Sequence, residues 1–135
     1  MKKYSKNVLR IHGTVIIFAG LALTVLGWIG TFQGKGMMAI LESEPIGYIG
    51  LFQAYLLMAC FGIVLWMASN LEERRIWHLA GFLAHSAPLA ANIVFWDQIE
   101  SYGISHNGIM LHITFMTIQA ITYLFYEQKQ PANTA

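Results

Sequence analysis

Three polar residues recur at intervals of seven along one apolar stretch of the sequence: His78, His85 and Asn92. Seven residues make two turns of an α-helix, so these side chains are expected to form one stripe on one helix face. The residues around them are almost all apolar or small, which is typical of a helix in lipid. A polar stripe on such a helix must face other helices, water or a ligand, because lipid offers it no hydrogen-bond partner.

The charged residues of the 135-residue chain are confined to a few short stretches. Only 11% of the residues are charged and 56% are hydrophobic, whereas a soluble domain has roughly 25% charged residues. Four charge-free stretches come close to the ~20 residues needed to cross a bilayer. We therefore predict an all-α integral membrane protein, an up-down-up-down four-helix bundle formed by residues 1–126 with a polar tail at 127–135. Its helices are expected at about 9–32, 46–69, 75–96 and 107–126.

The basic residues are distributed unequally between the two sides of this bundle. Seven of the eight lie in the two terminal segments and in the loop between the second and third helices, and only Lys35 lies in an opposite loop. The positive-inside rule then places both termini in the cytoplasm, and four crossings likewise require both termini on one side. The expected location is the cytoplasmic (inner) membrane.

Depth in the membrane sorts the histidines into two levels. His12 and His78 are both expected about one turn from the cytoplasmic ends of their helices. On the first and third helices of a bundle they could face each other. Two imidazoles at one level suit the axial ligation of haem, or one metal ion, so His12 and His78 are the candidate metal ligands. The alternative is a pair of interfacial histidines near the lipid head groups.

A second polar group is expected from mid-depth outward. Its members are His85, Asn92, His112, Gln119 and Gln53. Hydrogen-bond donors and acceptors without a carboxylate suit a neutral polar head group, such as a quinone carbonyl or a sterol-like hydroxyl. Pro88 is expected to loosen the helix beside His85, because it displaces the carbonyl of Ala84. The alternative for this group is a set of interhelical hydrogen bonds that hold the bundle together.

Small residues form another seven-residue stripe on the first helix. Gly13, Gly20 and Gly27 would let a second helix approach closely. That helix belongs either to the same chain, which we favour, or to a second copy in a homo-oligomer.

Several classes of function are disfavoured by what the sequence lacks. The expected spans contain no Asp or Glu, which argues against a carboxylate-coupled exchanger and a carboxylate-bridged di-metal site. There is no glycine motif of the nucleotide-binding kind, and a net charge of +1 gives no reason to expect a nucleic-acid partner. Cys60 is the only cysteine, so it cannot form an intrachain disulfide, and we expect it to be a small buried core residue.

Two long stretches carry a resemblance to a known group. The segments "IGLFQAYLLMACFGIVLWMAS" and "HLAGFLAHSAPLAANIVFW", separated by a short basic turn, follow a glycine-rich first helix. This layout resembles that of small DoxX-like four-helix integral membrane proteins. The resemblance covers most of the chain and implies the four-helix fold. Some members of that group are associated with quinone-linked redox complexes, but the histidines are not carried by the resemblance.

The leading hypothesis is a small membrane protein with an internal pocket of His, Asn and Gln side chains. The pocket would bind a hydrophobic ligand, with quinone, haem and lipid as the candidates, and the protein would be an accessory component of a larger membrane complex. The first alternative is a structural or assembly subunit that binds no ligand. The second is a small intramembrane enzyme, such as a lipid isomerase that uses His85 as acid or base.

Overall fold

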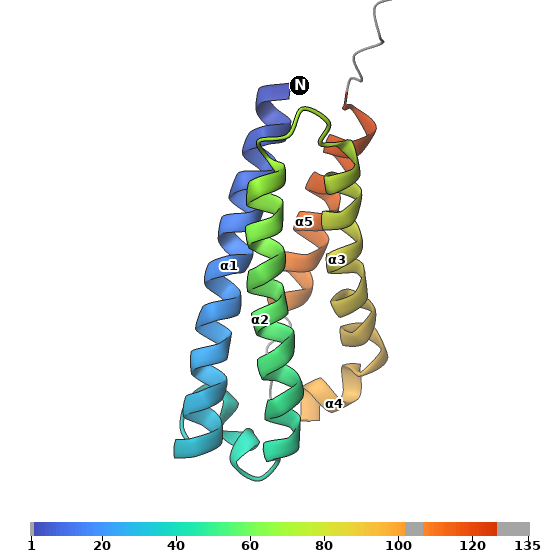
Figure 1. The fold of residues 1–135 in the computed structure, drawn as a ribbon. Coiled ribbons are helices and arrows are strands. Elements are labelled where there is room, and N and C mark those ends of the chain that lie inside the picture. The colour runs from blue at the N-terminus through green and yellow to red at the C-terminus, as the bar shows by residue number, and fades with distance from the viewer. Residues whose placement is uncertain (1, 102–106, 127–135) are drawn as a thin grey trace, which may run out of the picture. The chain divides into compact units, whose positions relative to one another are not determined.

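A computed structural model of the chain describes residues 2–101 and 107–126 (Figure 1). These residues form helices and turns with no strand among them, which confirms the all-α prediction for the described part of the chain. His106 and the tail at 127–135 lie outside the described residues. In chain order the elements are α1 (Lys2–Gln33), η1 (Gly36–Glu42), α2 (Pro45–Ala68), α3 (Arg75–Val94), α4 (Trp96–Ser101) and α5 (Asn107–Leu124).

The four long helices overlap the four apolar segments of the sequence. The largest difference is at the start of α1, which begins at Lys2 rather than near residue 9, because its first turns contain no Pro or Gly. The short helix α4 was not expected. Two helical segments, Lys3–Gln33 and Ile46–Ala68, are long and apolar enough to cross a membrane by length and composition. The up-down-up-down order of four membrane crossings and their orientation remain predictions.

The chain divides into two compact units, which are described separately. The α1–α2 unit comprises Arg10–Met67. The α3–α5 unit comprises Met1–Leu9, which is the start of α1, together with Ala68–Ala135.

Close helix packing in the α1–α2 unit depends on the glycine stripe. A methyl group added at Gly13 would lie 2.6 Å from the carbonyl oxygen of Gly62, and one added at Gly20 would lie 2.6 Å from that of Tyr55. At Gly27 the added carbon would lie 2.8 Å from the ring of Tyr48. The stripe therefore contacts α2 of the same chain, as the favoured alternative expected. Cys60 on α2 is exposed, so the expectation of a buried cysteine was wrong.

The connection between α1 and α2 folds back onto the end of α1. Gly34 has a φ of +58°, in the left-handed region that favours glycine, and it directs the chain away from the helix. The following 3₁₀ helix, η1, brings the backbone of Met38 against Gly30, where a side chain larger than hydrogen would not fit. Leu41 is buried in this contact region.

In the α3–α5 unit, the two long helices pack against each other. Helix α3 continues across Pro88 to Val94, so the expected loosening does not end the helix. Ser86 donates a hydrogen bond to the carbonyl of Phe82 at 3.0 Å, one turn earlier.

The glycine contact predicts the outcome of a matched pair of substitutions. Gly20→Ala forces α1 and α2 apart, and we expect it to cost about 1–3 kcal/mol of stability, as overpacked sites do. Gly50→Ala is the control, because Gly50 lies in the partner helix α2 and an added methyl group there meets nothing within 4 Å. Alanine is the better helix former, so this control is expected to be neutral or stabilising. Thermal unfolding in mild detergent, followed by circular dichroism, measures both; an unchanged Tm for Gly20→Ala would contradict the contact.

Candidate functional site

A buried histidine joins three helical segments of the α3–α5 unit. His78 on α3 is 0% exposed, and its Nε2 lies 2.7 Å from Oγ of Ser5 on α1. Its Nδ1 lies 2.6 Å from Oε1 of Gln119 on α5. An amide oxygen only accepts, so Nδ1 of His78 carries the proton and donates, and the Ser5 hydroxyl donates to the bare Nε2. Both nitrogens of the ring are thus used by the protein.

Tyr126 closes the same end of the unit. It is 7% exposed, and its hydroxyl donates to the carbonyl of Glu72 at 2.7 Å. The hydroxyl also accepts from the backbone N–H of Arg74 at 3.3 Å. The side chain of Arg74 donates from Nε to the carbonyl of Ser69 at 2.8 Å. These bonds fix the turn that leads into α3, and so fix the position at which His78 begins the polar stripe.

A pair of imidazoles lies two turns further along α3. Nδ1 of His85 and Nδ1 of His112 are 2.9 Å apart, and the ring centroids are 5.2 Å apart. Phe115 lies parallel to His85, with an interplanar angle of 8° and a centroid separation of 5.2 Å. His85 and Phe115 are both buried, whereas His112 is half-buried. We call Ser5, His78, Gln119, Phe115, His85 and His112 the polar column.

The short separation of the two imidazoles fixes how their protons are arranged. One Nδ1 must carry a proton and donate it to the lone pair of the other Nδ1. The donor ring then has a bare Nε2, and the neutral acceptor ring has a proton on Nε2. A hydrogen bond at the first of these Nε2 atoms would be accepted by the ring, and a hydrogen bond at the second would be donated by it. A proton taken up at the bare Nε2 can be balanced by transfer of the shared proton and release of the other Nε2 proton, so the pair is able to relay protons.

The structure divides the predicted site residues differently from the sequence analysis. It brings His85 and His112 together, but it pairs Gln119 with His78 rather than with His85. Asn92 lies on α3 two turns beyond His85 and is half-buried.

Two further predicted residues belong to the other unit. His12 is buried in the α1–α2 unit, and the exposed side chain of Gln53 lies on α2. The pairing of His12 with His78 as metal ligands therefore stays a prediction, as does the part of Gln53 in the pocket. Both nitrogens of His78 already have partners, so a metal ion at His78 would have to displace Ser5 or Gln119.

Three residues of this region were missed or misjudged from the sequence. Ser5 was not considered, although it lies seven residues before His12. Tyr126 was not counted among the site residues, although it lies seven residues after Gln119 and continues that interval. Phe115 was not counted either, but its ring stacks on His85. The seven-residue interval could have found the first two; the stacking has no sequence pattern of its own.

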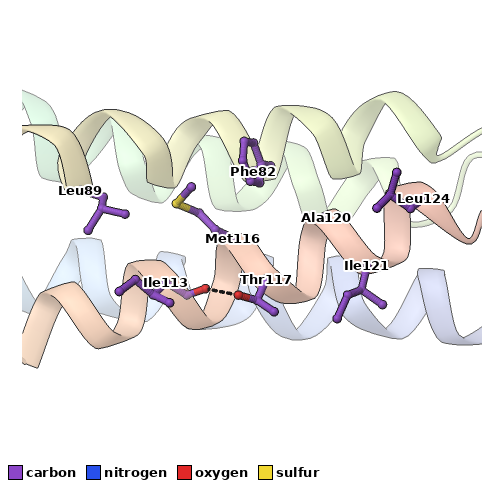
Figure 2. Close-up of a pocket in the computed structure, with 8 residues that line it drawn as sticks. All are labelled: Phe82, Leu89, Ile113, Met116, Thr117, Ala120, Ile121 and Leu124. Atoms are coloured by element: carbon purple, nitrogen blue, oxygen red, sulfur yellow. Dashed lines mark hydrogen bonds between the residues drawn. The ribbon is translucent and has the colours of Figure 1, made fainter.

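An apolar groove of about 320 Å³ follows the contact between α3 and α5. Figure 2 shows that Phe82 and Leu89 extend from α3 toward α5, and that Met116 extends from α5 toward them. Thr117 is the only polar side chain among the residues that line the groove, and its hydroxyl bonds to the carbonyl of Ile113 at 2.9 Å. The groove therefore offers hydrocarbon contact and little hydrogen bonding.

Comparisons with known proteins give no family for this chain. No protein-family model matches it, no curated protein matches it, and no solved structure matches it. The likeness to DoxX-like proteins thus remains one of layout. The structure defines the chain as an all-helical protein, over its described residues, in which the polar column joins α3, α5 and the start of α1.

The bond between His78 and Gln119 is testable by a double-mutant cycle. Gln119→Leu leaves a buried imidazole N–H without its acceptor, and we expect a loss of about 1–3 kcal/mol. In His78→Phe/Gln119→Leu both polar groups are gone, so part of that loss should be recovered. The control is Gln98→Leu on α4, where the side chain is exposed. Thermal unfolding in detergent measures all variants; equal Tm shifts for Gln119→Leu and Gln98→Leu would show that the buried bond contributes nothing.

Proposed function

We propose that this chain is an integral membrane protein whose four long helices all cross the bilayer, and that it binds a hydrophobic ligand at the His85–His112 pair. The ligand is a molecule of the quinone class, with a neutral polar head group, and the protein acts as an accessory component of a larger membrane complex. The observation that carries the ligand proposal is the imidazole pair itself. Its half-buried member, His112, uses Nδ1 within the pair, and its Nε2 can bond to a further group.

The distribution of polar and apolar side chains supports the membrane location. The most apolar windows of α1 and α2 are only 22% and 17% buried, although their mean hydropathies are 2.2 and 2.0. The core helix of a soluble protein would bury most of such a window. At the same time His78 and Gln119 are 0% exposed, while Phe18 and Ile46 are 69% and 83% exposed. Apolar residues outside and polar residues inside suit a protein surrounded by lipid.

The geometry of the pair supports a flat ligand with carbonyl or hydroxyl groups. Among the described residues, the only hydrogen bond shown for the half-buried His112 uses Nδ1, which leaves Nε2 for a head group. The stacked rings of His85 and Phe115 place planar groups beside the pair. A quinone has both features, and its reduction requires protons that an imidazole pair can relay.

The second candidate is a structural or assembly subunit without a ligand. It is favoured by the bonds of His78, because a histidine bound by both Ser5 and Gln119 has a complete structural role. The two candidates differ only in whether the His85–His112 pair meets a further molecule.

The proposed orientation is testable with single cysteines. In a Cys60→Ala background, Ser43→Cys reports the connection between α1 and α2, and Asn70→Cys reports the turn before α3. Both positions are exposed. In sealed right-side-out membrane vesicles, a membrane-impermeant maleimide should label Ser43→Cys, while Asn70→Cys should react only after the vesicles are opened. The reverse pattern would invert the orientation, and immediate labelling of both would contradict an odd number of crossings between them.

The ligand proposal is tested by mass spectrometry of what co-purifies in mild detergent. We expect a quinone in near-stoichiometric amount with the wild-type chain, together with the partner proteins of its complex. His112→Ala should lower quinone retention about tenfold or more, since a lost hydrogen bond in a buried site costs roughly 1.5 kcal/mol. Thr114→Ala is the control, because this exposed threonine lies on the same helix and bonds to the carbonyl of Met110.

Each other outcome of this purification selects an alternative. A red preparation with a Soret band that is lost in His78→Ala would replace quinone by haem. A colourless preparation whose extract holds no quinone would overturn the ligand proposal and leave the structural subunit.

A further inference from the structure

The groove between α3 and α5 continues toward the N-terminal end of α3. The described groove residues include Phe82, Ala120 and Leu124, and these three also line an adjoining hollow of about 190 Å³. The adjoining hollow adds Leu79 and Tyr123. The two hollows therefore form one apolar channel along the helix pair, from Leu89 and Ile113 to Leu79 and Tyr123. We call it the α3–α5 channel.

The length of this channel matches one leaflet of a bilayer. From Ile113 to Leu124 the helix rises by about 17 Å, at 1.5 Å per residue. The hydrocarbon core of a bilayer is about 30 Å thick, so each leaflet contributes about 15 Å. An extended acyl chain from one leaflet would therefore lie along the whole channel.

A positive charge stands at one end of the channel. The guanidinium of Arg75 lies 4.5 Å from the ring centroid of Tyr123, and Leu79 follows Arg75 by one turn of α3. Nε of Arg75 is buried and has no hydrogen-bond partner among the described residues. The Glu73 carboxylate accepts a hydrogen bond from the backbone N–H of Arg75 at 3.0 Å. No hydrogen bond from the guanidinium to this carboxylate is shown among the described residues. The guanidinium therefore lies at the end of the channel, and its Nε–H has no acceptor among the described residues.

The same combination occurs independently in the α1–α2 unit. A hollow of about 310 Å³ is lined by Trp66 together with Thr14, Ile17, Phe18 and Ile63. The guanidinium of Arg10 lies 5.1 Å from the centroid of the Trp66 ring. In each unit, therefore, an apolar hollow ends at an aromatic ring covered by an arginine.

We propose that the α3–α5 channel holds one acyl chain of an anionic phospholipid from the cytoplasmic leaflet, with the lipid phosphate bound by Arg75. The inference rests on the membrane location proposed above and is independent of the ligand at the histidine pair. The apolar channel accepts the chain, and the guanidinium supplies charged donors to the phosphate at the depth where the head groups begin. Tyr123 positions the guanidinium through its ring face.

The test compares two lipids that differ only in their head groups. The full chain is purified, depleted of lipid in mild detergent, and titrated with phosphatidylglycerol or phosphatidylcholine of the same acyl composition. Native mass spectrometry counts bound lipids, and Tm reports stabilisation. We expect phosphatidylglycerol to bind about fivefold more tightly, the contribution of one arginine near a membrane surface. In an Arg10→Gln background, which removes the corresponding arginine of the α1–α2 unit, Arg75→Gln should remove this preference, while Arg75→Lys, which keeps the charge, should retain most of it.

Two further variants separate the channel from general charge effects. Lys35→Gln removes one positive charge at an exposed position in the connection between α1 and α2, and it should leave the preference unchanged. Ala120→Phe fills the channel and should weaken binding of both lipids, with its helix content checked by circular dichroism. Equal binding of the two lipids by the wild type, or a preference that is as large in Arg10→Gln/Arg75→Gln as in Arg10→Gln, would overturn the proposal. Recovery of the chain in the soluble fraction without detergent would instead overturn the membrane location.

Discussion

Hydrogen bonds between α3 and α5 are the constraint on which the rest of this structure depends. A buried imidazole that lacks a hydrogen-bond partner costs free energy, so each buried histidine needs a partner within the protein. His78 does so with Ser5 and Gln119, and His85 does so with His112. These bonds require one rotation and one axial offset of α5 against α3. The turn held by Tyr126 and the stacking of Phe115 agree with that offset, and the channel along the same helix pair follows from it.

In the α1–α2 unit, close packing of the two helices depends on small residues at their contact. Gly13 and Gly20 remove the side chains that would keep the backbones of α1 and α2 apart, and Gly62 does the same from the other helix. Close backbone contact brings many atoms of the two helices together, and their summed dispersion attraction stabilises the pair. The two units thus use different means, polar complementarity in one and small residues in the other. A substitution is expected to act mainly within its own unit.

The sequence predicted much of the fold and less of the site, for physical reasons. Charge segregation located the long helices, because charged side chains are excluded from hydrocarbon, and the seven-residue intervals showed which faces are polar. The seven-residue spacing of the polar residues does not determine how far one helix is shifted along its neighbour. Gln119 was therefore grouped with His85, although the structure bonds it to His78. Phe115 was not counted among the site residues because the pattern concerned hydrogen bonds, whereas its contribution is a stacked ring. The start of α1 was placed too late, because basic residues end a hydrophobic pattern without ending a helix.

The most direct test of this account is a nuclear magnetic resonance measurement of the histidine pair. In the chain labelled with nitrogen-15 in its histidines, a coupling through the hydrogen bond should connect Nδ1 of His85 with Nδ1 of His112. One of the two rings should carry its proton on Nδ1 and the other on Nε2, and the coupling should vanish in His112→Phe. Two rings without mutual coupling, each bonded elsewhere, would contradict the pairing and with it the proposed site.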